Sequence, residues 1–267
     1  YYGEYKDNKE FIIQNNIDII LDEAIRKNEF DVYYQPIYNT KTKTFTACEA
    51  LVRLISNKYG YIGPEHFIKY AEMSGKIFEI DSFVIKDTIK FISTDTFKSL
   101  GIDKININLS ISECMDLKLY DYVTNLIKQY NINPTYLNFE ITEGKDITNH
   151  KQIYEVIKKF KDIGIEFSLD DYGIGYSNIE RFSNIPISTV KLDKTLVNNS
   201  KNEGMESVLS NTLNMIKSLG RKVVVEGIET NESLNEFLEY DCDFIQGFIY
   251  SKPVPKEEFI DFIKKSK

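Results

Sequence analysis

The stretch LNFEITEGKDITNHKQIYEVIKKFKDIGIEFSLDDYG, residues 137–173, decides how this chain folds. It begins with a short apolar run, 137–141, and ends with a second, 165–169, and both have the length of a buried strand. Between them apolar residues recur three or four positions apart, which predicts an amphipathic helix: Ile153, Val156, Ile157, Phe160 and Ile163. A strand, a helix and a second strand in this order predict two parallel strands of one sheet.

The same alternation continues along the rest of the chain. Apolar runs predict further strands over 32–37, 45–51, 105–109, 189–192, 223–225 and 244–245, and helical spacing predicts helices over 17–25, 64–74, 78–92, 122–130, 205–219 and 234–238. About eight strands with intervening helices fit an α/β fold, a (β/α)₈ barrel of the TIM type. Its first strand could run antiparallel to the others, and Pro36 suits the end of that strand. An open doubly wound sheet is the alternative.

The domain boundaries follow from polarity. Residues 1–15 are polar and are expected to be a linker or the end of a preceding domain, whereas 16–267 form one domain. The chain begins with Tyr1 rather than Met, as expected for a fragment of a longer protein.

Most of the predicted strands carry a polar side chain at or near the carboxyl end. The set comprises Glu49, Asn108, Glu140, Asp170, Asp171, Lys191, Glu226 and Gln246. In a parallel barrel the carboxyl ends of the strands meet at one rim, where such enzymes have their active sites. So many anionic groups would repel one another strongly unless cations lay between them. With only two histidines in the chain, oxygen ligands indicate a hard cation such as Mg²⁺ or Mn²⁺.

Composition excludes several other classes of protein. The net charge of −8 argues against binding to a nucleic-acid duplex, which needs a basic face. The apolar runs are too short to span a bilayer, so no membrane contact is expected of this segment. The three cysteines are widely spaced and indicate reduced thiols in a cytoplasmic setting, although sequence outside this segment could anchor a longer protein to a membrane.

Each residue of the set also has an ordinary structural explanation. A strand-end Asn such as Asn108 is common in turns, and a strand Lys such as Lys191 usually extends its ammonium group to solvent. Glu49 and Arg53 could form a structural ion pair, and Glu143 suits the start of a helix. The joint placement at successive strand ends favours a functional site.

Eight motifs together resemble the EAL domain, the cyclic di-GMP phosphodiesterase of bacteria. They are YYQPI (33–37), EALVR (49–53), NINLS (106–110), EITE (140–143), DDYGIGYSN (170–178), KLD (191–193), EGIE (226–229) and QGF (246–248) followed by Pro253. They occur in the order of that family and span the chain from about residue 17 onward. Leu54 departs from the family, since many members have Trp there.

The resemblance implies a role for each matched residue. Metal ligands are expected to be Glu49, Asn108, Glu140, Asp170, Asp171 and Glu226, with Gln246 acting through a water molecule, and the cofactors two divalent cations, Mg²⁺ or Mn²⁺. Lys191 would contact the catalytic water, so that Lys191, Glu49 and Glu226 form the catalytic set. Contacts to the substrate are expected from Gln35, Leu51, Arg53, Tyr250 and Pro253. Glu143 and Glu229 would support the loop that begins at Asp170.

The function implied is hydrolysis of cyclic di-GMP to linear 5′-pGpG by two-metal activation of water. A homodimer and an upstream sensor or GGDEF domain are expected partners in the full-length protein. One alternative is a receptor that binds cyclic di-GMP without hydrolysis, and another is a regulatory domain that acts through protein contacts. A glycosidase on the same barrel would need only two acids and would leave the other acids, Asn108 and Lys191 unexplained.

Overall fold

A computed structural model describes residues 10–142, 150–173, 185–193, 195–196 and 205–267. Eight strands close into a barrel: β1 (Phe30–Asn39), β2 (Thr44–Ser56), β4 (Lys104–Asn108), β5 (Leu137–Thr142), β6 (Glu166–Tyr172), β7 (Thr189–Leu192), β8 (Lys222–Val225) and β9 (Phe244–Ile245). The short strands β3 (Gly60–Ile62) and β10 (Val254–Pro255) add to β2 and β1. The predicted barrel is confirmed, and the open sheet is excluded because β1 pairs with both β2 and β9.

Strand β1 is antiparallel to both of its neighbours, whereas the ladder from β2 through β4, β5, β6, β7 and β8 to β9 is parallel. The antiparallel first strand is therefore confirmed. The strand does not end near Pro36 as the sequence suggests, but runs on to Asn39. Pro36 is tolerated because pairing on the other edge of β1 stops at Tyr34 and resumes at Tyr38, so no partner needs an N–H from proline there.

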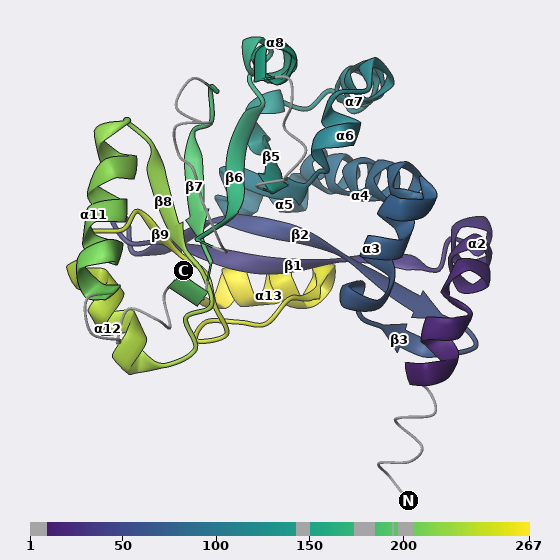
Figure 1. Cartoon of the computed structure of the whole chain (residues 1–267), viewed down its shortest axis with the longest axis horizontal. Helices are drawn as coiled ribbons and strands as arrows, with labels where there is room; N and C mark the ends of the chain where they lie inside the picture. Colours follow the sequence, from purple (N-terminus) through teal and green to yellow (C-terminus); the bar gives the residue numbers. More distant parts are fainter. Residues whose placement is uncertain (1–9, 143–149, 174–184, 194, 197–204) are drawn as a thin grey trace, which may run out of the picture.

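Helices surround the strands (Figure 1). Their bounds are α2 (Ile17–Lys27), α3 (Pro64–Ser74), α4 (Ile77–Ile92), α5 (Asp95–Leu100), α6 (Ile111–Cys114), α7 (Leu117–Tyr130), α8 (His150–Asp162), α11 (Met205–Ser218), α12 (Asn231–Glu239) and α13 (Lys256–Lys265), with a 3₁₀ turn at Pro134–Tyr136. The helices α5, α6 and α13 were not predicted from the sequence, and α13 packs along β1. The sequence also predicts a short helix near Ile179, after the strand that ends at Leu169, but this segment lies outside the described residues. No helix in the described part of the chain is long and apolar enough to cross a bilayer.

Residues 1–15 were predicted to be a linker or the end of a preceding domain, and the structure describes only residues 10–15 of this segment. Residues 10–15 are helical, and Ile13 is buried in a cluster with Ile17 and Phe67 of the lobe formed by α2 and α3. The boundary between linker and domain stays a prediction.

Alternation along the strands places polar groups inside the barrel. In β4, Ile105 and Ile107 pack outward into the core shared with the helices, so Asn106 and Asn108 point inward. In β5 the same rule sends Phe139 outward and Glu140 inward. The helices thus receive the apolar side chains of the strands, and the carboxyl-terminal rim receives the carboxylates.

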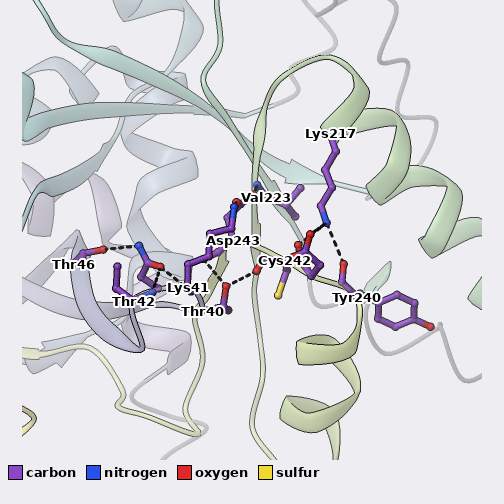
Figure 2. Close-up of polar contacts among 11 residues, drawn as sticks. Thr40, Lys41, Thr42, Thr46, Lys217, Val223, Tyr240, Cys242 and Asp243 are labelled. Carbon is purple, nitrogen blue, oxygen red and sulfur yellow. Dashed lines mark hydrogen bonds and ion pairs between the residues drawn. The ribbon is translucent and has the colours of Figure 1, made fainter.

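The barrel closes through the very short strand β9, and polar contacts strengthen this seam (Figure 2). The β1–β2 turn docks on the loop before β9, where the Thr40 hydroxyl donates to the carbonyl of Cys242 and its N–H to that of Asp243. The Asp243 carboxylate accepts from Lys41 Nζ at 2.7 Å and from the N–H of Val223 at 3.0 Å. One side chain therefore joins three segments: the β1–β2 turn, β8 and β9.

Asp243→Ala should weaken the seam, because it leaves the Val223 N–H without its acceptor. We expect the free energy of unfolding in urea to fall by about 2 kcal/mol, as for loss of a hydrogen bond to a charged group. Lys41→Met is the matched control, since an exposed ion pair contributes only about 0.2–1 kcal/mol. Equal losses in the two variants would contradict the role given to Asp243.

Candidate metal centre at the barrel rim

The Lys191 ammonium group occupies the middle of the predicted site. Its Nζ lies 2.7 Å from Glu140 Oε2, 2.8 Å from Glu226 Oε1, 3.1 Å from Asp170 Oδ1 and 3.4 Å from Glu49 Oε2. Lys191 is 1% exposed, so its charge is almost wholly removed from solvent. The structure thus brings four carboxylates from β2, β5, β6 and the end of β8 to one point, as the sequence predicts.

Two amides hold Glu49 at this point, and a third amide contacts one of them. Asn108 Nδ2 donates to Glu49 Oε1 at 2.7 Å, and Gln246 Nε2 donates to Glu49 Oε2 at 2.6 Å. Gln246 Nε2 also reaches Gln35 Oε1 at 3.1 Å, and Gln35 in turn donates to the carbonyl of Ser251. The residue after Gln246 is Gly247, where a Cβ would lie 2.0 Å from the carbonyl oxygen of Ile228. Only glycine permits this close approach of the two chain segments.

The carboxylates form two triads that share one residue. Ligand atoms of Glu49, Glu140 and Asp170 lie within 4.8 Å of one another, and so do those of Asp170, Asp171 and Glu226. We call these the first and second triads. Two cation sites bridged by Asp170 fit this arrangement, since oxygen donors suit hard divalent cations.

Two buried oxygens at the rim support the same interpretation. Among the described residues, neither Asp170 Oδ1 nor Gln246 Oε1 receives a hydrogen bond. Asp170 Oδ1 does lie within ion-pair distance of Lys191, but no donor is well aligned with it. A buried acceptor without a donor is costly, and a cation or a cation-bound water would satisfy both atoms.

Burial and mutual repulsion dominate the electrostatics of the site. Burial raises the pKa of Glu140 well above its usual value and that of Glu226 to about 8, and the nearby Lys191 offsets this only in part. Burial also opposes ionisation of Glu49, yet Lys191 and the hydrogen bonds from Gln246 and Asn108 lower its pKa. Burial alone would lower the pKa of Lys191, but the surrounding carboxylates raise it well above the usual value. Lys191 therefore keeps its proton.

Asp171 adopts an unusual backbone conformation. Its φ is +56°, and the pairing of β6 with β7 shifts register between Leu169 and Tyr172. This irregularity allows two adjacent carboxylates, Asp170 and Asp171, to contribute to one triad, which regular alternation would forbid. Burial and the neighbouring Asp170 raise the pKa of Asp171 to about 6.

Two hollows meet at the site. The first, of about 200 Å³, is lined by residues that include Arg53, Glu72, Asp81, Asn108 and Glu140. The second, of about 290 Å³, is lined by residues that include Gln35, Glu49, Asp170, Lys191, Glu226, Glu229 and Phe248. Leu51 lines both hollows. Glu140 of the first triad lines the first hollow, whereas Glu49, Asp170 and Glu226 line the second.

The remaining predicted residues differ in where they lie. Arg53 donates to the carbonyl of Val52, and its guanidinium group lies over the Tyr33 ring. Tyr250 is not brought to the rim, because its ring stacks on Tyr38 and packs edge-on against Phe45. Pro253 immediately precedes β10, beside Tyr34 of β1. Glu143 lies outside the described residues.

Sequence reasoning missed several residues that border the site. Glu72 and Asp81 come from the helices α3 and α4, whose apolar spacing gave no signal of a binding role. Phe248 is half exposed at the second hollow although it is a large aromatic residue. The sequence signal that could have identified Phe248 as a site residue is its position directly after Gln246 and Gly247.

Removing the central charge should destabilise the protein. In Lys191→Met four buried carboxylates lose their shared counter-ion, and breaking a buried ion pair costs about 3–5 kcal/mol. Urea unfolding at pH 7 with EDTA measures the effect, and Lys104→Met, a strand lysine whose ion pair with Glu166 is partly exposed, is the control. A midpoint unchanged from that of the native protein would show that Lys191 does not neutralise the cluster.

Cation binding should strengthen as the pH rises. With a pKa of about 8, Glu226 is mostly protonated at neutral pH and below, and with a pKa of about 6, Asp171 carries a proton about half of the time at pH 6. A cation must displace those protons, so we expect affinity for Mn²⁺ at pH 8 to exceed that at pH 6 by about tenfold or more. Calorimetric titration at both pH values tests this, and an affinity that is independent of pH would refute it.

Comparisons with known proteins agree with this geometry. The chain is 29% identical over 265 residues to the signaling protein YkoW of Bacillus subtilis, covering 98% of this chain and 33% of that protein. It is 27% identical over 246 residues to the cyclic di-GMP phosphodiesterase NbdA of Pseudomonas aeruginosa, covering 91% of this chain and 31% of that protein. The chain thus spans about a third of the length of these curated relatives.

Solved structures show the same fold. The PaMucR phosphodiesterase in complex with c-di-GMP superposes with a TM-score of 0.83 at 25% identity, covering 90% of this chain and 97% of that one. The EAL enzyme Bd1971 in its cAMP- and cyclic-di-GMP-bound form gives a TM-score of 0.85 at 25% identity, covering 97% and 70%. The model of the EAL domain family matches residues 20–253. Because this match takes in most of the sequence and every described residue of both triads, the chain belongs to the EAL domain family.

Proposed function

We propose that this domain hydrolyses cyclic di-GMP to linear 5′-pGpG with the help of two divalent cations, Mg²⁺ or Mn²⁺. The observation that carries the proposal is the pair of carboxylate triads that share Asp170 around Lys191. Relatives and structural neighbours named as cyclic di-GMP phosphodiesterases or complexes support the choice of substrate. For every role predicted at the rim, this chain has a residue of the expected type at the matching position.

The shape of the site suits a cyclic dinucleotide. Such a ligand has two bases on either side of a ring that contains two phosphates. The two hollows, which share Leu51, offer a space for each base, and the first triad has Glu140 in one hollow and Glu49 and Asp170 in the other, where a phosphate between the bases would be. In the first hollow, Glu72 and Asp81 provide carboxyl groups that can pair with the N–H groups of guanine. Arg53 in the same hollow provides a cation for a phosphate.

The residues of the chain have distinct tasks in this reaction. When bound, the two cations polarise the phosphodiester and lower the pKa of the attacking water. Asn108 and Gln246 hold Glu49 in place through its two oxygens. Lys191 retains its proton, because the surrounding carboxylates raise its pKa against the effect of burial. Its role is therefore to orient the attacking water and to stabilise negative charge rather than to accept a proton. Gln246 Oε1 remains available as an acceptor for a water molecule.

The homodimer, the upstream sensor or GGDEF domain and the cytoplasmic setting stay predictions. They concern the longer protein, whereas the metal centre is assembled from residues of this one chain.

Purified protein with Mg²⁺ or Mn²⁺ should convert cyclic di-GMP to pGpG. Chromatographic separation of substrate and product measures this conversion. Glu49→Ala should lower kcat more than about 100-fold, because it removes a predicted metal ligand. Loss of a residue that only hydrogen-bonds such a ligand already lowers metal affinity or activity about 10–100-fold. Glu23→Ala, on the remote helix α2, is the control and should keep full activity. Turnover that persists in excess EDTA would rule the mechanism out. Binding of the nucleotide at saturating metal without any product would instead favour a receptor.

A further inference from the structure

The interior of the barrel beneath the rim is divided into two chemically different halves. One half is apolar and consists of Ile37, Ala47, Val224 and Phe244. The other half is polar and includes Asn106, Asn138, Ser168 and Thr189, and both halves line a cavity of about 50 Å³ together with Lys104, Glu166 and Lys222. Barrels of this type usually fill such a layer with Val, Ile and Leu. Asn106, Asn138 and Ser168 are all buried, so this polar half-layer is costly and calls for a physical reason.

Strand register places the polar half-layer directly beneath Glu140. Asn106 pairs with Asn138 between β4 and β5, and two residues further along each strand Asn108 pairs with Glu140. Asn106 Nδ2 donates to Glu140 Oε1 at 2.7 Å, while Lys191 Nζ donates to Oε2 at 2.7 Å. The carboxylate is therefore held through both oxygens, from below by an amide and from the rim by an ammonium group.

We propose that Asn106 is a positioning residue for the first triad. It holds Oε1 of Glu140 from the interior of the barrel, so that Oε2 stays directed at Lys191 and at the cation. An apolar side chain at 106 would leave Oε1 of a buried carboxylate without a donor, and the carboxylate would turn to find another. The inference rests on the proposed function only in taking the first triad to be a cation site.

The cavity below explains how the polar half-layer is tolerated. Asn138 donates to Ser168 Oγ at 2.8 Å, but its Oδ1 is buried and has no donor among the described residues. Both Asn106 and Asn138 line the cavity, which exceeds the roughly 10–15 Å³ that one water molecule needs. A water molecule bound in this cavity would supply the donor that Asn138 Oδ1 needs.

The test compares two substitutions within the same layer. Asn106→Leu keeps the number and branching of the side-chain heavy atoms and removes the donor to Glu140, whereas Asn138→Leu makes the same change beside Ser168. Substrate-free protein is titrated calorimetrically with Mn²⁺. We expect Asn106→Leu to weaken one of the two sites by about 10–100-fold and to leave the second triad unaffected, and Asn138→Leu to keep both affinities within about threefold.

Kinetics and structure provide independent readouts. At subsaturating Mn²⁺ the Asn106→Leu variant should lose kcat while KM for cyclic di-GMP hardly changes, because Asn106 lines neither of the two hollows. Its metal-free crystal structure should show the Glu140 carboxylate rotated, with the 2.7 Å contact to Lys191 lost.

Three results would overturn the inference. They are unchanged Mn²⁺ binding in Asn106→Leu, an equal loss in Asn138→Leu, or a Glu140 carboxylate that keeps its orientation without Asn106. Native protein that binds two Mn²⁺ ions but releases no pGpG would refute the proposed function alone. Native protein that binds no Mn²⁺ would refute the proposed function and would also deny Asn106 any role toward a cation.

Discussion

A single buried ammonium group shared by four carboxylates is the interaction on which the rest of this structure depends. Glu49, Glu140, Asp170 and Glu226 all lie within a few ångströms of Lys191, and burial still raises the pKa of Glu140 and Glu226, so the four can ionise together only when more positive charge lies among them. Lys191 provides one unit of that charge, and divalent cations are suited to provide the rest. The barrel therefore brings together groups that repel one another, and Lys191 supplies the positive charge that this structure places among them.

The closure of the barrel and the geometry of the site are mechanically linked. Gln246, which positions Glu49, directly follows β9, and β9 has only two residues to pair with each neighbour. Asp243 joins this strand to the β1–β2 turn and to β8 at the opposite end of the barrel. A weaker seam would consequently loosen Glu49, even though Asp243 is distant from the rim.

The interior below the rim shows how much polar structure a metal centre needs beneath it. Glu140 is the most deeply buried carboxylate of the site, and its lower oxygen cannot reach solvent. Asn106 satisfies that oxygen, and the surrounding polar side chains and their cavity follow from this one requirement. Half of the layer thus departs from the usual apolar filling because of the group directly above it.

The sequence by itself determined the succession of strands and helices, and it identified the residues of the rim from Glu49 to Gln246. It could do so because alternation is local and because strand ends are marked by polar residues. Tertiary structure alone decided that β1 closes the barrel, that Asp170 is shared by two triads, and that Tyr250 packs away from the site. It also decided that Asn106 meets Glu140, 34 positions later in the chain. Such contacts depend on strand register and on a backbone irregularity at Asp171. Neither feature can be read from the local pattern of the sequence, because both depend on which distant residues pair.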